Sequence, residues 1–307
     1  MPETAIISDS TCCLPSAMAQ KYNISFVPVK YSINGVPHTD PMNDQDLVAL
    51  YASGELGKKN DIETTAPSVD DFEQAIHQKL SQGFKRVIVQ TLNRTQGDTY
   101  KNANTAVSNV KRTLQDKTTT VRVMDSRTVF AGQGLMAIET VRRLMKEKSE
   151  DIARRKMDVL SEKIHTFVIP KDLIIARERS VKRGEHNISK TAAYLANTLG
   201  LHAVVCNMND SSYKAATIRG FDNAAKALFD HARSRIEAGL YSPIIMVNYA
   251  GSMEVLKSLP GYKDLERVAK AKKIMLIPSV ASIICAVYAS PGSISLALAT
   301  EPHEWTK

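Results

Sequence analysis

Cysteine is scarce: four residues in a chain of 307 are too few and too scattered to stabilise the fold through disulfide bonds. Cys12, Cys13, Cys206 and Cys285 form no Cys-x-x-Cys pair and lack zinc-ligand spacing, which argues against a disulfide scaffold or a zinc module. A reduced cytoplasmic location is therefore expected. Cys12 and Cys13 follow the first expected strand and could react, but the pattern favours a small apolar core role for at least one of them.

Long apolar runs are also missing. No stretch reaches the roughly 18–20 residues that cross a bilayer, and Met1 to Thr4 lead into a strand rather than a signal peptide. Aromatic residues make up 6% of the chain and do not alternate with basic ones, so we expect no nucleic-acid partner. The net charge of +8 comes from basic residues that are interleaved with acids, which indicates solvated helix faces. An acidic protein or a transient membrane surface stays open as a partner.

Several catalytic signatures are absent. The sequence has no G-x-S-x-G elbow, no phosphate loop and no complete dinucleotide fingerprint, so no cofactor is expected. Its histidines lack metal-ligand spacing, and we expect no metal site. Asp9 and Asp125 could form a catalytic carboxylate pair, but both also suit loop capping. A transferase or kinase-like enzyme acting on a small anion therefore remains an alternative.

What the sequence does contain is a regular alternation of strands and helices in its first half. This pattern predicts an α/β domain over residues 1–160 with a mostly parallel sheet and flanking helices. Regular alternation fades in the basic stretch 149–163, and residues 161–307 are expected to form an α+β domain with a mixed sheet. Near the end, residues 273–277, 282–288 and 293–299 are apolar runs that we interpret as strands.

The most informative stretch is Val87–Ala106, which predicts a buried strand, a polar turn and a helix from Thr99. Gly97 permits a positive φ angle, and Asp98 or Thr99 can cap the helix. A strand that opens into a helix N-terminus presents free N–H groups and the positive end of a dipole, which suits an anion. An ordinary βα loop is the alternative interpretation.

Neutral hydrogen-bond donors gather at the expected carboxyl ends of the strands, where ligands of α/β sheets bind. They are Ser10, Thr11, Thr64, Thr65, Asn93, Thr95 and Thr99. Hydroxyl, amide and backbone N–H groups without an evident base suit holding an anion more than transforming it. Such a cluster, backed by apolar strands, could bind a carboxylate whose tail lies in a hydrophobic tunnel.

The same segments resemble the motifs of the DegV family. The opening IISDSTCCL resembles the family's strand followed by Asp-Ser-Thr, and TTAPS at 64–68 resembles Thr-Ser-x-Pro-Ser. Residues 93–103 resemble Ser-Ser-x-Leu-Ser-Gly-Thr-Tyr-x-x-Ala. Asp125-Ser126 and Gly132-Gln133-Gly134 fit the next block, and 288–292 resemble His-Thr-Gly-Pro-Gly. The likeness spans nearly the whole chain and is more specific in the first half.

The resemblance implies two α/β domains with a long-chain fatty acid or related lipid in a tunnel between them. It also implies a carrier that performs no bond-making step and presents the carboxylate to a separate ATP-dependent fatty acid kinase subunit. Carried over by position, the headgroup contacts are Thr64, Thr65, Asn93 and Tyr288. Ser10, Arg94 and Thr95 complete the predicted ligand-binding set.

The sequence departs from the family pattern at three places. Asn93 replaces a serine and keeps a donor, whereas Tyr288 replaces a histidine and keeps only a hydroxyl. The family's Gly-Gly-Arg-Ile-Ser segment appears as 185–189, EHNIS, with Arg183 as the nearest substitute for the arginine. A lipid other than an ordinary fatty acid, or another small anion, is therefore an open alternative, as is a regulatory protein that binds an acidic partner.

Overall fold

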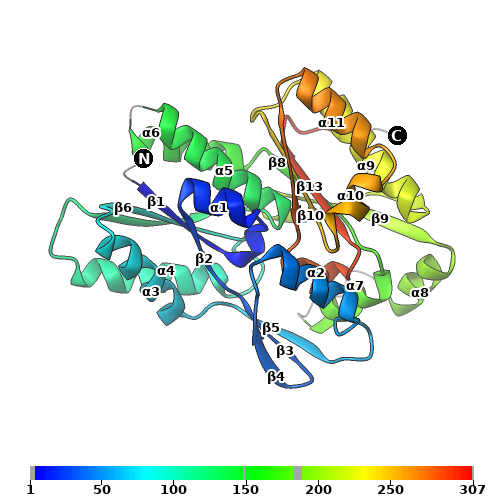
Figure 1. The fold of residues 1–307 in the computed structure, drawn as a ribbon, viewed down its shortest axis with the longest axis horizontal. Coiled ribbons are helices and arrows are strands. Elements are labelled where there is room, and N and C mark those ends of the chain that lie inside the picture. The colour runs from blue at the N-terminus through cyan, green and yellow to red at the C-terminus, as the bar shows by residue number, and fades with distance from the viewer. Residues whose placement is uncertain (1–3, 148, 183–188, 306–307) are drawn as a thin grey trace.

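The computed structural model describes residues 4–147, 149–182 and 189–305 (Figure 1). Its first half contains a parallel sheet in the order β2-β1-β6-β7. The strands are β1 (Thr4–Asp9), β2 (Ile24–Val27), β6 (Arg86–Thr91) and β7 (Thr120–Asp125). The parallel sheet predicted from the alternating pattern is thereby confirmed.

Helices cover both faces of this sheet. Successive side chains of a strand point to opposite faces, so Ile7 and Val89 pack on α3 and α4, while Ile6 and Ile88 pack on α5. The helices of this half are the 3-10 helix η1 (Ser10–Cys12), α1 (Ser16–Tyr22), α3 (Val69–Ser81), α4 (Thr99–Thr113), α5 (Ala131–Lys146) and α6 (Glu150–Ser161).

The second half contains a mixed sheet in the order β10-β9-β8-β13-β11-β12. Here β11 and β12 pair in parallel, and the other neighbouring strands pair antiparallel. The strands are β8 (Ile164–Ile169), β9 (Leu201–Met208), β10 (Ser211–Arg219), β11 (Ile244–Tyr249), β12 (Met275–Val280) and β13 (Ile294–Ala299). The outer face carries α9 (Phe221–Ala238), α10 (Met253–Ser258) and α11 (Tyr262–Ala271). The prediction of a mixed second sheet is confirmed.

Helix α5 lies between the two large sheets (Figure 1). Every residue from Ala131 to Val141 is buried. One side of the helix belongs to the same apolar cluster as Ile6 and Ile88, and the other side reaches Met246 and Ala297 of the second sheet. The two domains therefore share part of one core. The predicted boundary between residues 160 and 161 falls at the last residue of α6, just before the connection to β8, and stays a prediction.

A third, smaller sheet in the order β4-β3-β5 lies at the bottom of Figure 1. It consists of β3 (Lys30–Ile33), β4 (Val36–Thr39) and β5 (Ile62–Thr65), all antiparallel. Asn-Gly is a strong hairpin signal in a sequence, and Asn34 and Gly35 have positive φ and link β3 to β4 as a two-residue hairpin loop. Around it lie α2 (Asp44–Ser53), α7 (Leu173–Lys182) and α12 (Ile283–Ala289), whereas α8 (Lys190–Thr198) packs on α7 and β9.

One expected strand is wrong. Residues 282–288 form the helix α12 instead, with Ser282 at its N-terminal end. Apart from Tyr288, which is partly buried, the residues of this helix are buried, so the segment is apolar on all sides and carries no periodicity that separates a helix from a strand. This correction matters because α12 carries Tyr288.

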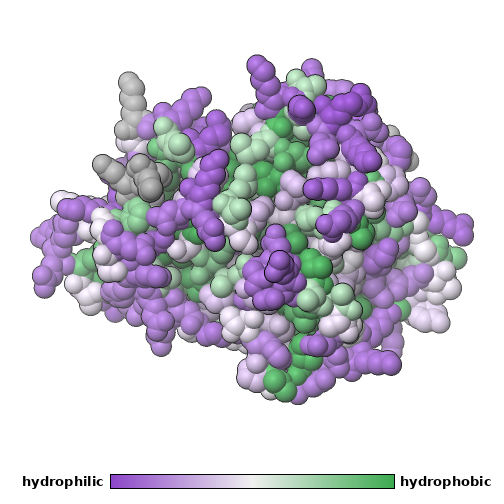
Figure 2. Space-filling model, viewed as in Figure 1, coloured by the Kyte–Doolittle hydropathy of each residue, from purple (hydrophilic) through white to green (hydrophobic). Residues whose placement is uncertain are grey.

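The face in Figure 2 is hydrophilic over most of the outer helices, with hydrophobic residues in its middle and toward the small sheet. Within the described ranges, no helix is long and apolar enough to cross a membrane. Several of the basic residues interpreted as solvated helix faces are ion-paired. On α5, Arg142 and Arg143 bind Glu139, and on α6, Arg154 binds Asp158.

Candidate functional site

Asp9, at the carboxyl end of β1, is a fully buried structural carboxylate. It accepts hydrogen bonds from the N–H and the hydroxyl of Thr11, from the Leu92 N–H at 2.9 Å and from Gln133 Nε2 at 3.0 Å. Desolvation raises the pKa of Asp9, and these donors oppose that rise. The Asp9 oxygens connect β1 to the loop after β6 and to α5. Asp9 therefore has the loop-capping geometry, which is one of the two roles that the sequence suggests for it.

Ser10 faces away from this network and binds a carboxylate that sequence reasoning missed. Its hydroxyl donates to Asp40 Oδ2 at 2.7 Å and accepts from the Val29 N–H at 3.1 Å. Asp40 follows β4 and is 2% exposed. Its burial raises the pKa of Asp40 to about 6, against the opposing hydrogen bonds of Ser10 and Met42.

The loop after β6 is built around Asn93, as its polar sequence predicts. Asn93 is buried, and its Oδ1 accepts from the N–H and the hydroxyl of Thr95 at 2.8 and 2.9 Å. This side-chain turn is typical of asparagine in loops. Gly97 has φ +93°, as expected, and Asp98 occupies the N-cap position of α4 without a side-chain capping bond. The first N–H groups of α4 are thus left uncapped by that side chain.

Arg94 bridges the two halves of the protein. Its side chain lies 3.0 Å from Asp210 in the β9–β10 turn and 3.6 Å from Asp125 at the end of β7. The Asp125 carboxylate also accepts from the backbone N–H groups of Arg94 and Arg127. Desolvation raises the pKa of Asp125. Asp125 therefore has the loop-capping geometry, and Arg94 has acidic partners on both sides.

Thr64 and Tyr288 meet across the two domains. Thr64 Oγ1 of β5 and the Tyr288 hydroxyl of α12 lie 2.7 Å apart. The segment after β5 also contacts α4, because Asn102 Nδ2 donates to the Pro67 carbonyl at 2.8 Å. The TTAPS motif, α4 and Tyr288 are thus neighbours, whereas Thr65 is exposed at the end of β5.

The structure therefore divides the predicted ligand-binding residues into groups. It joins Thr64 to Tyr288 and Asn93 to Thr95, and it gives Arg94 and Ser10 acidic partners of their own. We use the name seat for Thr64, Thr65, Asn93 and Tyr288.

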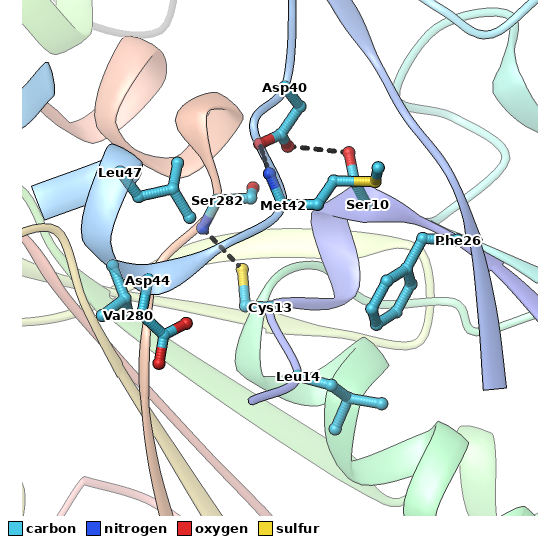
Figure 3. A pocket seen from close by; sticks show the side chains of 10 residues that line it. All are labelled: Ser10, Cys13, Leu14, Phe26, Asp40, Met42, Asp44, Leu47, Val280 and Ser282. Atoms are coloured by element: carbon cyan, nitrogen blue, oxygen red, sulfur yellow. Dashed lines mark hydrogen bonds between the residues drawn. The ribbon is translucent and has the colours of Figure 1, made fainter. Parts of the chain in front are cut away.

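A pocket lies where β1, β2, α2 and the start of α12 meet (Figure 3). The hollow measures about 300 Å³ to its open mouth, and its inner cavity of about 20 Å³ has room for about one water molecule. Its wall contains both apolar and polar side chains. They are Ser10, Cys13, Leu14, Phe26, Asp40, Met42, Asp44, Leu47, Val280 and Ser282.

The cysteines have the core role favoured by the sequence. All four are free and buried. Desolvation raises the pKa of Cys12 to about 12 and that of Cys13 well above its usual range, so both thiols stay protonated at neutral pH. Cys13 lies in the pocket wall, where its Sγ accepts from the Ser282 N–H at 3.1 Å.

Two residues of this region had no recognisable sequence signal. Asp40 lies in a polar loop, HTDPMND, that resembles any surface turn. The sequence pattern predicts a strand at Ser282, whereas the structure places this residue at the start of a buried helix. In the described parts of the chain, no group of three or more His, Cys, Asp or Glu side chains is placed to hold a metal ion. Arg183 and residues 185–188 lie outside the described residues.

Comparison with known proteins defines the class. The family model described as an uncharacterised protein of the DegV family matches residues 3–301. The chain belongs to the DegV family. A DegV domain-containing protein of Xanthomonas axonopodis pv. citri is 26% identical over 309 residues, which cover 98% of each chain.

Solved structures share the fold. A stearic acid-binding protein from Eubacterium ventriosum has a TM-score of 0.78 and 22% identity, over 96% of this chain and 98% of that one. The fatty acid kinase B3 protein of Streptococcus pneumoniae, solved with linoleic acid, has a TM-score of 0.73 and 17% identity, over 96% and 99%. The two-domain architecture implied by the resemblance is confirmed.

Proposed function

We propose that this protein is a carrier that binds one long-chain fatty acid between its domains, with the carboxylate at the seat. The observation that supports it best is the 2.7 Å contact between Thr64 and Tyr288, two neutral donors from different domains. Behind them, an apolar cluster runs along α12 and includes Ile62, Ile284 and Val287. Polar groups at one end of an apolar cluster suit a fatty acid.

Each predicted residue has a proposed role. Thr64, Thr65, Tyr288 and the Asn93 amide donate to the carboxylate, because a buried carboxylate needs several donors. Thr95 and Arg94 hold the loop that positions Asn93, and Ser10 lines the neighbouring pocket.

Relatives in fold support the same function, since structures of this fold are described as binders of stearic and linoleic acid. One of them carries the name of a fatty acid kinase protein, so we propose a separate ATP-dependent kinase as partner and a cytoplasmic location. The carrier itself performs no reaction in this proposal.

The direct test is to purify the full chain from a bacterial host and analyse its extracted lipids by mass spectrometry. We expect about one long-chain acid per protein molecule, and binding of added hexadecanoic or octadecanoic acid after delipidation. Absence of both would reject the carrier. Turnover of a nucleotide that is lost in Asp125→Ala would favour the enzyme instead.

A further inference from the structure

Polar side chains contribute to the wall of the pocket in Figure 3, among them Ser10, Asp40 and Ser282. Ser282 is 3% exposed, and within the described residues its hydroxyl has no hydrogen-bond partner other than the Cys13 thiol. The neighbouring Cys13 thiol is a weak partner. Asp40 is 2% exposed and receives the Ser10 hydroxyl and the Met42 N–H. Since a carboxylate offers about four acceptor sites, Asp40 can accept further hydrogen bonds from a ligand.

The rest of the wall of the same pocket is apolar apart from Asp44. Leu14, Phe26 and Met42 line it, and Leu47 and Val280 belong also to the apolar cluster along α12. Ser282 and Tyr288 stand at opposite ends of α12, about 9 Å apart along its axis at 1.5 Å per residue. An acyl chain that follows α12 from the seat reaches this pocket partway along its length.

An unsubstituted chain does not match this wall. It would cover the Ser282 hydroxyl and the remaining acceptor sites of Asp40 with hydrocarbon, and burying polar atoms without strong partners is costly. A hydroxyl group on the chain resolves the mismatch, because it can donate to Asp40 and accept from Ser282. The hollow has about 20 Å³ that a water molecule could enter, and a hydroxyl oxygen can take the place of a water with its hydrogen bonds preserved.

We propose that this pocket is a subsite for a hydroxyl group in the middle of the acyl chain, so that the carrier prefers mid-chain hydroxy fatty acids to unsubstituted acids of equal length. The inference rests on the proposed function and narrows its ligand class. Burial raises the pKa of Asp40 to about 6, so at neutral pH Asp40 is mostly the carboxylate that accepts a hydroxyl.

The test compares three acids of one length on the delipidated full chain, by competition with a fluorescent fatty acid. We expect 10-hydroxyoctadecanoic acid to bind at least tenfold more tightly than octadecanoic acid. The isomer 2-hydroxyoctadecanoic acid, whose hydroxyl stays at the seat, should remain within about threefold of octadecanoic acid. Equal binding of all three acids would overturn the subsite and leave the carrier intact, whereas no binding of any would overturn both.

Variants at Ser282 assign the preference to the pocket. Ser282 makes no side-chain capping bond to α12, so Ser282→Ala should fold, and it should reduce the tenfold preference to about threefold or less. Ser282→Thr keeps the hydroxyl and should retain the preference. This variant therefore separates the effect of losing the hydroxyl from a general loss of packing. Ser258→Ala, an exposed serine on α10, is the matched control. A full preference in Ser282→Ala would overturn the assignment.

Discussion

Tyr288 and Thr64 illustrate how single side chains define the seat. Their hydroxyl groups already bind each other at 2.7 Å, so a ligand must compete with this bond and offer stronger acceptors. A carboxylate does so, since hydrogen bonds to a charged acceptor are roughly twice as strong as neutral ones.

Removing the Tyr288 hydroxyl should therefore weaken ligand binding. In Tyr288→Phe we expect fatty acid affinity to fall by about 1–3 kcal/mol, the usual value of a hydrogen bond to a charged group. Isothermal titration with octadecanoic acid measures it. The exposed Tyr241→Phe serves as control. An unchanged dissociation constant in Tyr288→Phe would move the carboxylate away from this residue.

Local signals in the sequence predicted individual elements well. A serine followed three residues later by an acid is a capping-box pattern, and Ser68 and Asp71 form such a box at the start of α3, where each side chain bonds the backbone N–H of the other. The hairpin at Asn34-Gly35 was equally readable. Signals of this kind depend on residues that are close in the sequence, so tertiary packing does not change what they predict.

What the sequence could not predict depends on long-range packing. The run 282–288 became a helix because it is buried on nearly all sides, and no periodicity marks such a segment. The pairing of β5 with β3 and the bond from Ser10 to Asp40 likewise join segments that only the fold brings together. The sequence motifs predict the residues of the seat, whereas only the structure shows which of the predicted ligand-binding residues contact one another.

At the scale of elements, α5 is packed too closely for any side chain at two of its positions. A Cβ on Gly134 would collide with the Met246 side chain and the Cys12 carbonyl, and one on Gly132 with Thr128 and Thr166. We expect Gly134→Ala to lower the free energy of unfolding by about 1–3 kcal/mol, as overpacking does. Urea denaturation measures this.

The same helix supplies the control. Met145→Ala changes an exposed residue of α5 and should stay within about 0.5 kcal/mol. If Gly134→Ala and Met145→Ala had equal stability, the close approach of α5 to both sheets would be wrong.

The C-terminal segment is held on the second sheet by a cluster of rings. His231 of α9 stacks on Trp305 with ring centroids 4.3 Å apart, and its Nε2 lies 2.9 Å from His303 Nε2. The ring of His165 of β8 contacts the same His303 in a tilted arrangement, with centroids 4.7 Å apart. Charged groups around the cluster are Arg235, Lys163 and Glu301.

Burial lowers the pKa of His165 to about 4 and that of His231 to about 3, below the usual 6.5. Because the unfolded chain then binds more protons, stability is full above about pH 6.5 and falls as the pH drops toward 4. We expect a loss on the order of 2 kcal/mol from each of the two histidines by pH 5. Trp305, the single tryptophan of the chain, reports it by fluorescence.

Two variants isolate this effect. His231→Phe removes one of the groups that must protonate and should flatten the fall between pH 6.5 and 5. His77→Gln changes an exposed histidine on α3 and should leave the profile unaltered. Identical pH profiles for the wild type and His231→Phe would contradict the role of the cluster.

At the scale of the whole molecule, Arg94 links the loop of the seat to the β9–β10 turn through Asp210. Arg94 is half exposed, so we expect a coupling of about 0.2–1 kcal/mol in a double-mutant cycle of Arg94→Ala and Asp210→Asn. The coupling should shrink in 0.5 M salt.

Lys101 and Asp98, an exposed pair at the start of α4, give the comparison cycle, which should show less coupling. Zero coupling between Arg94 and Asp210 would show that this ion pair does not link the domains energetically. A loss of fatty acid affinity beyond tenfold in Arg94→Ala alone would instead place the arginine in contact with the carboxylate.

The position of α5 also has a consequence for how the protein is made. A ribosome releases this helix long before β11 and β13, the strands that cover its second face. At roughly 5–20 residues per second, the interval from Lys146 to Ile244 lasts about 5–20 s. During that time the nascent chain exposes an apolar helix face that only its own unfinished half can cover, so chains arrested in this interval should need a chaperone to stay unaggregated.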